Sequence, residues 1–300
     1  MVMPSVTYVL LPGQGTDLGA VAMQPLRNGD LARTAHSVLG VDVTRLTPSQ
    51  LAKTEFSQLV LTVRCLDAVL SLRKQRPELF GPRRAVVFAG FSLGEITALV
   101  AAGKLEVADA LKIVRMRAKA MQKACDEDPG AMVTLIGAKD ESLIPPELCV
   151  ASRLFPGCRV VAGPSAAVNR VQWTPAIAEK VIKRDDLAGA FHTESMRPAA
   201  TAILSLHGEV HQDQGYGNCF VYSNTTGELY GDDDDVIEML ASQVVNTVEW
   251  EKILGQILND PRADTIIEIG ATGQHRAMLK RFPNKNEQGE KLVQDLALVL

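Results

Sequence analysis

The stretch "GFSLGE", residues 90–95, lies between the apolar run "RAVVFA" and the helix-compatible stretch "ITALVAAG". The pattern Gly-x-Ser-x-Gly is typical of a strand that turns abruptly into a helix, because the glycines leave room for the strained backbone that lifts the serine oxygen outward. The amide groups that open such a helix favour nearby negative charge. Serine also commonly caps helices. The stretch therefore predicts that Ser92 is either a nucleophile or a helix-capping hydroxyl.

The composition is that of a globular protein and argues against two classes. Hydrophobic residues make up 46% of the 300 and charged residues 22%, enough for one large domain or for a large domain with a smaller inserted one. The net charge of −4 argues against a nucleic-acid-binding protein, which usually has a basic excess. No apolar run approaches the ~20 residues that a membrane span requires.

The cysteines and the start of the chain bear on its compartment. Five cysteines without a C-x-x-C pair predict free thiols in a reducing compartment, and neither a disulfide framework nor a zinc site. The strand-like run "VTYVLL" begins within a few residues of Met1 and leaves no room for a targeting segment. We therefore expect a cytosolic chain or a processed form that has lost its leader. The five are Cys65, Cys125, Cys149, Cys158 and Cys219.

Strand-like and helical patterns alternate along the first 128 residues. The run "VTYVLL", helical segments through residue 79, the run "RAVVFAG" and its following helix predict parallel strands with crossover helices, an α/β fold. The stretch over 104–125 has the strongest helical periodicity. Its apolar stripe consists of Val107, Leu111, Val114, Ala118, Met121 and Cys125.

The pattern changes at "DEDPGAM". Residues 129–190 contain the short strand-like pieces "AMVTLIG", "LCVAS" and "CRVVAG" and one helical run over 165–181. They predict a small α+β unit inserted into a discontinuous large domain of residues 1–128 and 191–300. Strand-then-turn patterns return in "CFVYSNTTG" and "DTIIEIGATG". The acidic run "GDDDDV" at 231–236 is interpreted as a helix start and solvent-exposed charge, and we expect no metal site.

A nucleophilic serine needs a base. Of the five histidines, His36, His207 and His211 lie among polar or small residues and are interpreted as surface or capping residues. His192, in "AGAFHTESMRP", follows the inserted unit, where clefts form between domains, and His275 is its competitor.

Stabilisation of negative charge on an attacked carbonyl needs backbone N–H groups. The residue after the serine, Leu93, supplies one in the usual geometry of such a turn. The stretch "LPGQG", residues 11–15, follows the first strand, and its glycines let the backbone approach a ligand. By itself, an ordinary turn is the better interpretation of it.

Seven motifs occur in one order over about 290 residues: "LLPGQGT", "GFSLGE", "VRMRAKAMQKA", "GAFHTESMRPA", "VYSNTTG", "QVVNTVEW" and "IIEIGATG". This series resembles the malonyl-CoA:acyl carrier protein transacylases, and is most similar to the mitochondrial form, in which phenylalanine also precedes the serine. The resemblance implies a large α/β-hydrolase-like domain with a parallel sheet and an inserted, ferredoxin-like α+β subdomain. It also implies malonyl transfer through a malonyl-serine intermediate, in support of fatty-acid synthesis.

The resemblance implies roles for five residues around the reacting carbonyl. Ser92 is expected to be the nucleophile and His192 its general base and acid. The backbone N–H groups of Gln14 and Leu93 are expected to form the oxyanion hole. Gln243 is expected to orient the imidazole through its backbone carbonyl, in place of the usual Asp.

The resemblance further implies that Arg117 binds the free carboxylate of the malonyl group. Because an unpaired buried charge is costly, a guanidinium that matches both carboxylate oxygens suits this task. On a helical wheel Arg115 and Arg117 flank the apolar stripe on opposite sides, so periodicity alone leaves both open. Phe191 is expected to disfavour an α-methyl group on the substrate. Ser152, Thr247 and "GATGQH" depart from the residues usual in the family.

The resemblance implies acyl carrier protein and malonyl-CoA as partners, no cofactor, a monomer, and the mitochondrial matrix as the location, with the cytoplasm as the alternative. Acyl carrier proteins are acidic, so we expect a locally basic docking surface. The cluster in "EKVIKR", next in sequence to the cleft, is the preferred candidate. The candidate residues are Arg73, Lys74, Arg76, Arg83, Arg84, then Lys180, Lys183, Arg184, then Lys280 and Arg281.

Two rival functions remain open. An esterase of the α/β-hydrolase type would use Ser92 with Asp264 and a late histidine, His275. A non-catalytic module would bind the carrier protein without forming an ester on Ser92.

Overall fold

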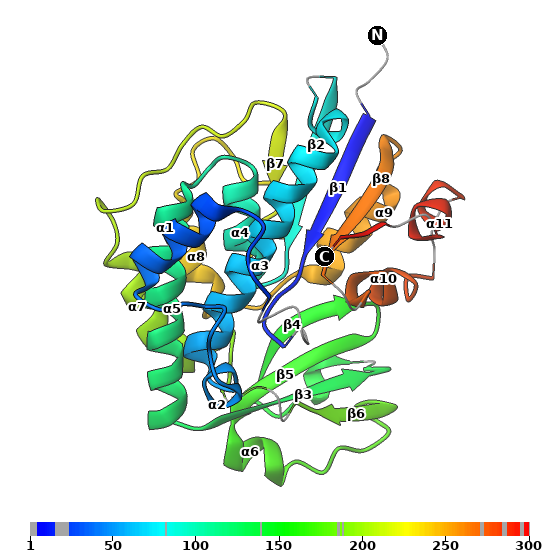
Figure 1. Cartoon of the computed structure of the whole chain (residues 1–300). Helices are drawn as coiled ribbons and strands as arrows, with labels where there is room; N and C mark the ends of the chain where they lie inside the picture. Colours follow the sequence, from blue (N-terminus) through cyan, green and yellow to red (C-terminus); the bar gives the residue numbers. More distant parts are fainter. Residues whose placement is uncertain are drawn as a thin grey trace.

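Two β-sheets organise the chain (Figure 1). The computed structural model describes residues 5–15, 24–81, 83–138, 140–184, 187, 189–270, 273–283, 287–294 and 297–299. The larger sheet has five parallel strands in the order β7-β2-β1-β8-β9. These are β1 (Ser5–Leu11), β2 (Arg84–Gly90), β7 (Cys219–Val221), β8 (Ala263–Ile269) and β9 (Ala297–Val299). The prediction of an α/β fold with a parallel sheet is confirmed.

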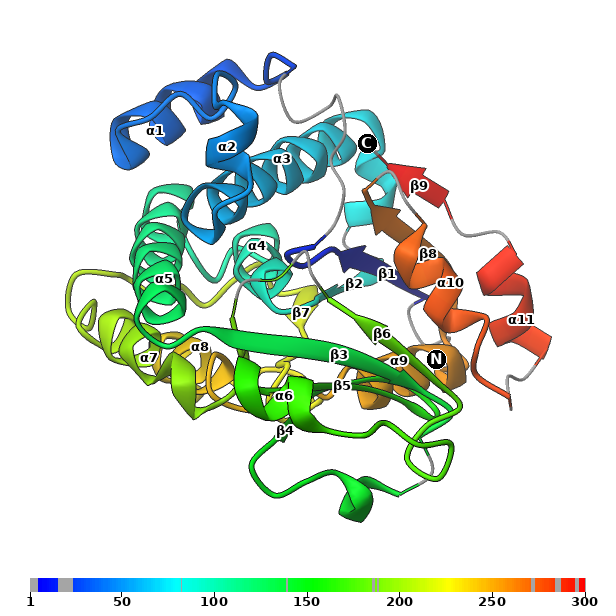
Figure 2. The ribbon, with the colours of Figure 1, turned by 90° about the horizontal axis from the view of Figure 1, so that it is seen from below.

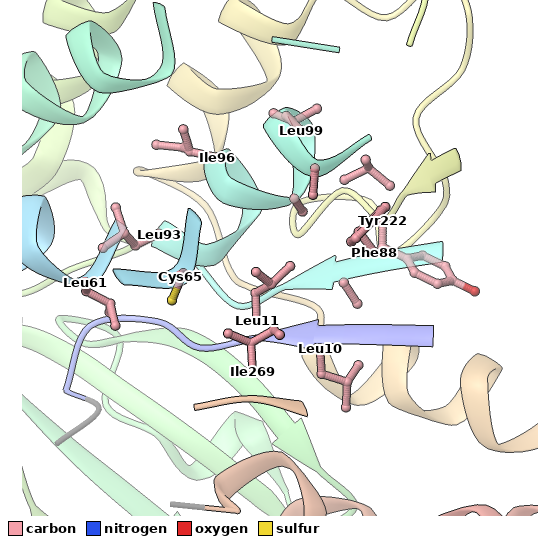
Figure 3. Packing of buried hydrophobic residues seen from close by; sticks show 14 of the residues in the cluster. Leu10, Leu11, Leu61, Cys65, Phe88, Leu93, Ile96, Leu99, Tyr222 and Ile269 are labelled. Atoms are coloured by element: carbon pink, nitrogen blue, oxygen red, sulfur yellow. The ribbon is translucent and has the colours of Figure 1, made fainter. Parts of the chain in front are cut away.

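The central strands are apolar because they are covered on both faces. Six of the seven residues of β1 are buried, and β1 pairs with β2 on one side and β8 on the other. Helix α4 (Leu93–Ala101) packs against both β1 and β2, and α3 (Thr54–Gln75) packs on α4 and β8 (Figure 2). Figure 3 shows part of the resulting core, in which Leu93, Ile96 and Leu99 of α4 join Leu11 and Phe88.

Helix α5 (Val107–Glu127) confirms the amphipathic pattern in the sequence. Five of the six stripe residues are buried and Val107 is half-buried. This helix packs against α3 and α1 (Gly29–Leu39) on one side and α7 (Arg197–Leu204) on the other. The remaining helices are α2 (Pro48–Leu51), α6 (Ser165–Arg170), α8 (Val236–Gln243), α9 (Trp250–Asn259), α10 (Gln274–Leu279) and α11 (Glu287–Gln294).

The second sheet is antiparallel and has the order β4-β5-β3-β6 (green in Figure 1). Its strands are β3 (Gly130–Ile136), β4 (Cys149–Phe155), β5 (Cys158–Pro164) and β6 (Lys180–Lys183). A separate small apolar cluster, which includes Val133, Leu135 and Val161, packs on one of its faces with Val168 of α6. The short strand-like pieces of the sequence therefore correspond to β3, β4 and β5.

The helical run expected over 165–181 is wrong beyond its first six residues. Helix α6 ends at Arg170. Pro175 lacks an N–H donor, and its ring disfavours the helical conformation at Thr174, so the helix does not continue. The chain instead turns, with Ile177 N donating to Thr174 O at 3.0 Å, and β6 begins at Lys180.

The segment before α9 pairs with β4, an edge strand of the small sheet. Val248 N donates to Ala151 O at 3.0 Å, and Arg153 N donates to Val248 O at 2.9 Å. Thr247 donates its hydroxyl to Val150 O at 2.6 Å. Ion pairs of Arg153 and Arg159 with Glu249, Glu251 and Glu141 reinforce the junction. The small sheet is thus tied to the chain that follows α8.

Within the described part of the chain, no helix combines the length and apolar character needed to cross a membrane.

Candidate active site

Ser92 lies at the sharp turn that joins β2 to α4. Its backbone has φ 51° and ψ −108°, a conformation that residues other than glycine rarely adopt. A Cβ on Gly90 would lie 2.0 Å from Gly94 C, and one on Gly94 would lie 2.7 Å from Pro12 O. The two glycines therefore allow the turn to pack against the end of β1. No capping bond from the Ser92 side chain to the helix is found in the described residues, and the helix-capping alternative is wrong.

His192 faces this serine. Its Nε2 lies 2.8 Å from Ser92 Oγ, and its Nδ1 lies 2.9 Å from the carbonyl oxygen of Gln243. A carbonyl oxygen only accepts, so Nδ1 carries the proton and Nε2 is left to accept from the serine hydroxyl. Burial, with a smaller contribution from the nearby Arg117 charge, lowers the pKa of His192 to about 4. The imidazole is therefore neutral near pH 7.

Arg117 reaches the same hydroxyl from α5. Its Nη2 donates to Ser92 Oγ at 3.1 Å, and its Nη1 donates to Gln58 Oε1 of α3. The side chain is 2% exposed, and burial lowers its pKa to about 10, so it stays charged at neutral pH. Its Nε is buried and has no hydrogen-bond partner among the described residues. Nε and Nη2 form one edge of the guanidinium, which suits a carboxylate ligand. Arg115 instead donates to Val38 O at 2.8 Å, on the other flank of the helix.

These side chains line one cavity of about 450 Å³, counting the space at its open mouth. Of the residues predicted for the site, Gln14, Ser92, Arg117, Phe191 and His192 line it. Met121, Met132 and Val160 form an apolar wall of the cavity, and Ser152 also lines it. Leu93 and Gln243 lie behind Ser92 and His192.

The end of β1 packs directly on the serine turn. Phe91 N donates to Leu11 O at 3.0 Å, and a Cβ on Gly13 would lie 2.6 Å from the Phe91 ring. Gln14 follows and donates from its side chain to Thr54 Oγ1. Leu93 begins α4, where the first amide N–H groups of a helix lack intrahelical partners. Residues 14–15 form a turn, and Gly13 allows the chain before it to lie close to the Phe91 ring.

Several residues of the site had no role assigned from the sequence. Asn224 Oδ1 accepts from Ser92 N at 2.6 Å, and Asn224 Nδ2 donates to Gly90 O at 2.7 Å. Glu95 is fully buried in the first turn of α4 and accepts from Tyr230 and Gln243. Asn224 lies in the quoted motif "VYSNTTG", whereas nothing local marks the Glu95 carboxylate as buried.

The esterase triad is not formed. His275 is buried against Trp250, with ring centroids 5.1 Å apart, and Trp250 in turn contacts Phe91 edge-on at 5.4 Å. Asp264 pairs with Arg84 at 2.7 Å, near the beginnings of β8 and β2, whereas Ser92 follows the end of β2. Among the described residues, no group of three or more His, Cys, Asp or Glu is arranged to hold a metal ion. Asp235 caps α8, as the acidic run predicted.

The three predicted basic clusters differ in their contacts and in their position relative to the cavity. In the first, Arg73 lies between the rings of Phe80 and Tyr216, Arg76 pairs with Glu78, and Arg84 with Asp264. In the second, Arg184 lines the cavity itself. The third, Lys280 and Arg281, follows α10.

Comparison with known proteins agrees with this geometry. The family model described as the acyl transferase domain matches residues 7–293. A probable mitochondrial malonyl-CoA-acyl carrier protein transacylase from Drosophila melanogaster is 34% identical over 279 residues, which cover 85% of this chain and 73% of that protein. The mitochondrial malonyl-CoA-acyl carrier protein transacylase from Mus musculus is 30% identical over 305 residues, 92% of this chain and 79% of that protein.

Solved structures show the same fold. The malonyl-CoA:acyl carrier protein transacylase from Xanthomonas oryzae pv. oryzae superposes with a TM-score of 0.78 at 26% identity, over 99% of this chain and 94% of that one. A malonyl-transacylase solved in complex with its type II PKS acyl-carrier protein has a TM-score of 0.79 at 24% identity, over 98% and 95%. At that identity the second likeness concerns the fold alone.

Proposed function

The chain belongs to the acyl transferase family, and we propose that it transfers the malonyl group from malonyl-CoA to the thiol of an acyl carrier protein. The observation that carries the proposal is the contact of one hydroxyl with two groups. Ser92 Oγ lies 2.8 Å from a neutral imidazole nitrogen of His192 and 3.1 Å from a charged nitrogen of Arg117. This arrangement supplies a nucleophile, its base and a cation for the substrate carboxylate.

The first step acylates the serine. His192 Nε2 takes the proton of the Ser92 hydroxyl as its oxygen attacks the thioester carbonyl of malonyl-CoA. The negative charge on the carbonyl oxygen is stabilised by the backbone N–H groups of Gln14 and Leu93. The carbon–sulfur bond then breaks, and the imidazolium returns its proton to the departing thiolate of coenzyme A. The Gln243 carbonyl keeps Nδ1 protonated and stabilises the imidazolium between the two proton transfers.

The second step reverses the first with a different thiol. The phosphopantetheine thiol of the carrier protein gives its proton to His192 and attacks the malonyl ester, and Ser92 leaves with that proton. Arg117 holds the malonyl carboxylate in both steps through its Nε–Nη2 edge. Phe191, which lines the cavity next to His192, restricts space for an α-methyl group. No step requires a cofactor, so we propose that none is used.

Partners and location follow from the same assignment. Lys180, Lys183 and Arg184 are the proposed docking residues for an acidic carrier protein, because Arg184 lines the cavity that the phosphopantetheine thiol must enter. The mitochondrial relatives support a location in the mitochondrial matrix. We propose a monomer, since one chain supplies the whole constellation of Ser92, His192 and Arg117.

We also propose finer descriptions of the two units. Residues 1–128 and 191–300 form the α/β-hydrolase-like domain, and residues 129–190 form the inserted unit. The order β4-β5-β3-β6 with antiparallel pairing supports a ferredoxin-like description of that unit. Its first crossover contains only a 3-10 turn, Glu141–Leu143, where a ferredoxin-like fold has a helix.

The test is incubation with malonyl-CoA, acid quench and mass mapping of the acylated residue, followed by a chase with phosphopantetheinylated carrier protein. We expect the malonyl ester on Ser92, its absence from Ser92→Ala, and its transfer to the carrier thiol in the chase. A chain that binds the carrier protein and never carries the ester is a binding module. A chain that releases free malonate as fast with the carrier protein as without it is an esterase. Either result refutes the proposed transfer.

A further inference from the structure

We propose that Glu95 is a positioning residue for the acyl transfer: its ionised carboxylate holds Gln243 and the serine turn in place and thereby aligns His192 with Ser92. The inference rests on the function proposed above and goes beyond it, because Glu95 touches neither substrate nor reacting atom. It is carried by a chain of hydrogen bonds behind the turn.

The carboxylate of Glu95 has three donors around it. Oε1 accepts from the Tyr230 hydroxyl at 2.6 Å. Oε2 accepts from Gln243 Nε2 at 2.6 Å and from Asn224 N at 3.2 Å. The side chain is fully buried. A buried carboxylate is tolerated when donors satisfy its oxygens, and here they do so.

Gln243 links this carboxylate to both reacting groups. Its side-chain nitrogen donates a second bond to the Ser92 carbonyl at 2.8 Å, and its backbone carbonyl accepts from His192 Nδ1 at 2.9 Å. Asn224 acts in parallel, since its backbone N–H is held by Glu95 and its side chain binds both Ser92 N and Gly90 O. The carboxylate thus fixes Gln243 and Asn224, the two residues that hold the serine turn. Through them it also fixes the positions of Ser92 and His192 relative to each other.

The charge state of Glu95 decides whether this arrangement holds. Oε2 faces only N–H donors, so a proton can be accommodated only on Oε1, where it must be donated to the Tyr230 oxygen. The bonds from Gln243 and Asn224 then run to a neutral group and weaken. Burial raises the pKa of Glu95 to about 7, while its hydrogen bonds and the Arg117 charge oppose that rise. Titratable or charged groups that face it are Tyr230, from the segment after β7, and Arg117, from α5; Gln243 and Asn224 are neutral amides.

Glu95→Gln is an isosteric test of this role. The amide nitrogen can take the place of Oε1 and donate to the Tyr230 oxygen, while the amide oxygen still accepts from Gln243 and Asn224. The variant therefore imitates the protonated wild type at every pH. Its charge loss leaves Arg117 free of a neighbouring anion, so binding of the malonyl carboxylate is not weakened. We expect kcat to fall and KM for malonyl-CoA to stay equal or decrease.

The experiment measures Ser92 acylation by malonyl-CoA in single turnovers between pH 5 and 9. We expect the wild-type rate to rise with pH through about 7 and the Glu95→Gln rate to lack that rise. The two rates should lie within about fourfold of each other at pH 5.5, where only about 3% of Glu95 is ionised, and differ about tenfold to a hundredfold at pH 8.5, the size of effect expected for a misaligned reacting pair. A ratio that is constant over the whole range overturns the proposal, because a merely structural role lowers activity at all pH values alike.

Two further variants complete the design. Glu268→Gln removes another buried carboxylate, which accepts from the backbone N–H groups of His275 and Arg276 and, among the described residues, has no hydrogen bond to the serine turn. It should keep the wild-type rise, and loss of the rise there refutes the assignment to Glu95. Tyr230→Phe keeps the charge and removes one donor, so the rise should move to higher pH. If the midpoint of the rate increase stays at the wild-type pH in Tyr230→Phe, the proposal is contradicted. This test can be made even if Glu95→Gln does not fold.

Reaction of Ser92 with a sulfonyl fluoride gives the same profile without malonyl-CoA. If the wild type shows no malonyl ester but its sulfonylation rises through pH 7 and Glu95→Gln lacks that rise, the proposed function fails and the positioning role stands. If malonyl transfer occurs and both profiles of Glu95→Gln match the wild type, the positioning role fails alone.

Discussion

Replacing Arg117 by alanine should remove the preference for malonyl over acetyl groups. In the structure this guanidinium is 2% exposed, lines the cavity, and presents an Nε that has no partner among the described residues. A malonyl carboxylate that enters this cavity leaves water and needs a buried cation. An acetyl group carries no charge and needs none. The change therefore acts on one substrate far more than on the other.

The size of the effect follows from the burial of the pair. Removing one partner of a buried ion pair costs about 3–5 kcal/mol, because the other charge is left uncompensated. With 1.36 kcal/mol for each factor of ten in rate, kcat/KM for malonyl relative to acetyl should fall about a hundredfold to a few thousandfold. The lost bond from Arg117 Nη2 to Ser92 Oγ affects both substrates and cancels in this ratio.

The assay compares Ser92 acylation by malonyl-CoA and acetyl-CoA in the wild type and in Arg117→Ala. Arg115→Ala is the matched control, because Arg115 leaves the same helix on the other side and binds Val38 O. The control should keep the wild-type ratio. If Arg117→Ala slows both substrates equally, the carboxylate is bound elsewhere and the assigned role of Arg117 is refuted.

Three other predictions test the site. His192→Ala should abolish Ser92 acylation while His275→Ala keeps it, as measured by intact mass after malonyl-CoA treatment; equal loss in both would mean that the dyad is misassigned. Gly90→Ala should destabilise the fold by several kcal/mol and remove activity, because its Cβ would lie 2.0 Å from Gly94 C, and thermal unfolding would detect this; an unchanged Tm would contradict the packing of the turn. On acidification, His275→Gln should lose less free energy of unfolding than the wild type. Burial lowers the pKa of His275 to about 4, so between pH 6.5 and 4 this imidazole binds a proton only in the unfolded chain. The difference should reach about 3 kcal/mol at pH 4 in urea titrations, and parallel curves would show that the imidazole is not buried in its neutral form.

The serine turn shows how far local sequence reaches. "RAVVFAG", Ser92 and the following helix follow from strand-forming residues, two glycines and a helix-compatible run, all within about fifteen positions. The structure adds why both glycines are needed, namely contacts with one another and with Pro12 O. The amphipathic helix α5 could likewise be predicted, because the spacing of its apolar residues depends only on neighbours within the same helix. The prediction of one helix over 165–181 was wrong beyond Arg170, because Pro175 prevents the helix from continuing.

The partners of Ser92 could not be read from periodicity or spacing. Those patterns did not decide whether His192 or His275 is the base, nor whether Arg115 or Arg117 binds the carboxylate. The family resemblance selected His192 and Arg117. In the structure both side chains contact Ser92. Burial of the Glu95 carboxylate and its bonds to Tyr230 and Gln243 had no sequence signal, because an acidic residue in the first turn of a helix is ordinarily exposed and favourable there.

The amino-acid sequence by itself determined the elements: parallel strands, the amphipathic helix, the strained serine turn and the short strands of the small sheet. These depend on side chains and backbone preferences of near neighbours. Only the tertiary structure decided which imidazole lies 2.8 Å from Ser92, 100 residues away in sequence, and which carboxylate lies buried behind it. Contacts between such distant positions, and the desolvation that shifts their pKa values, arise from the packing of whole sheets and helices.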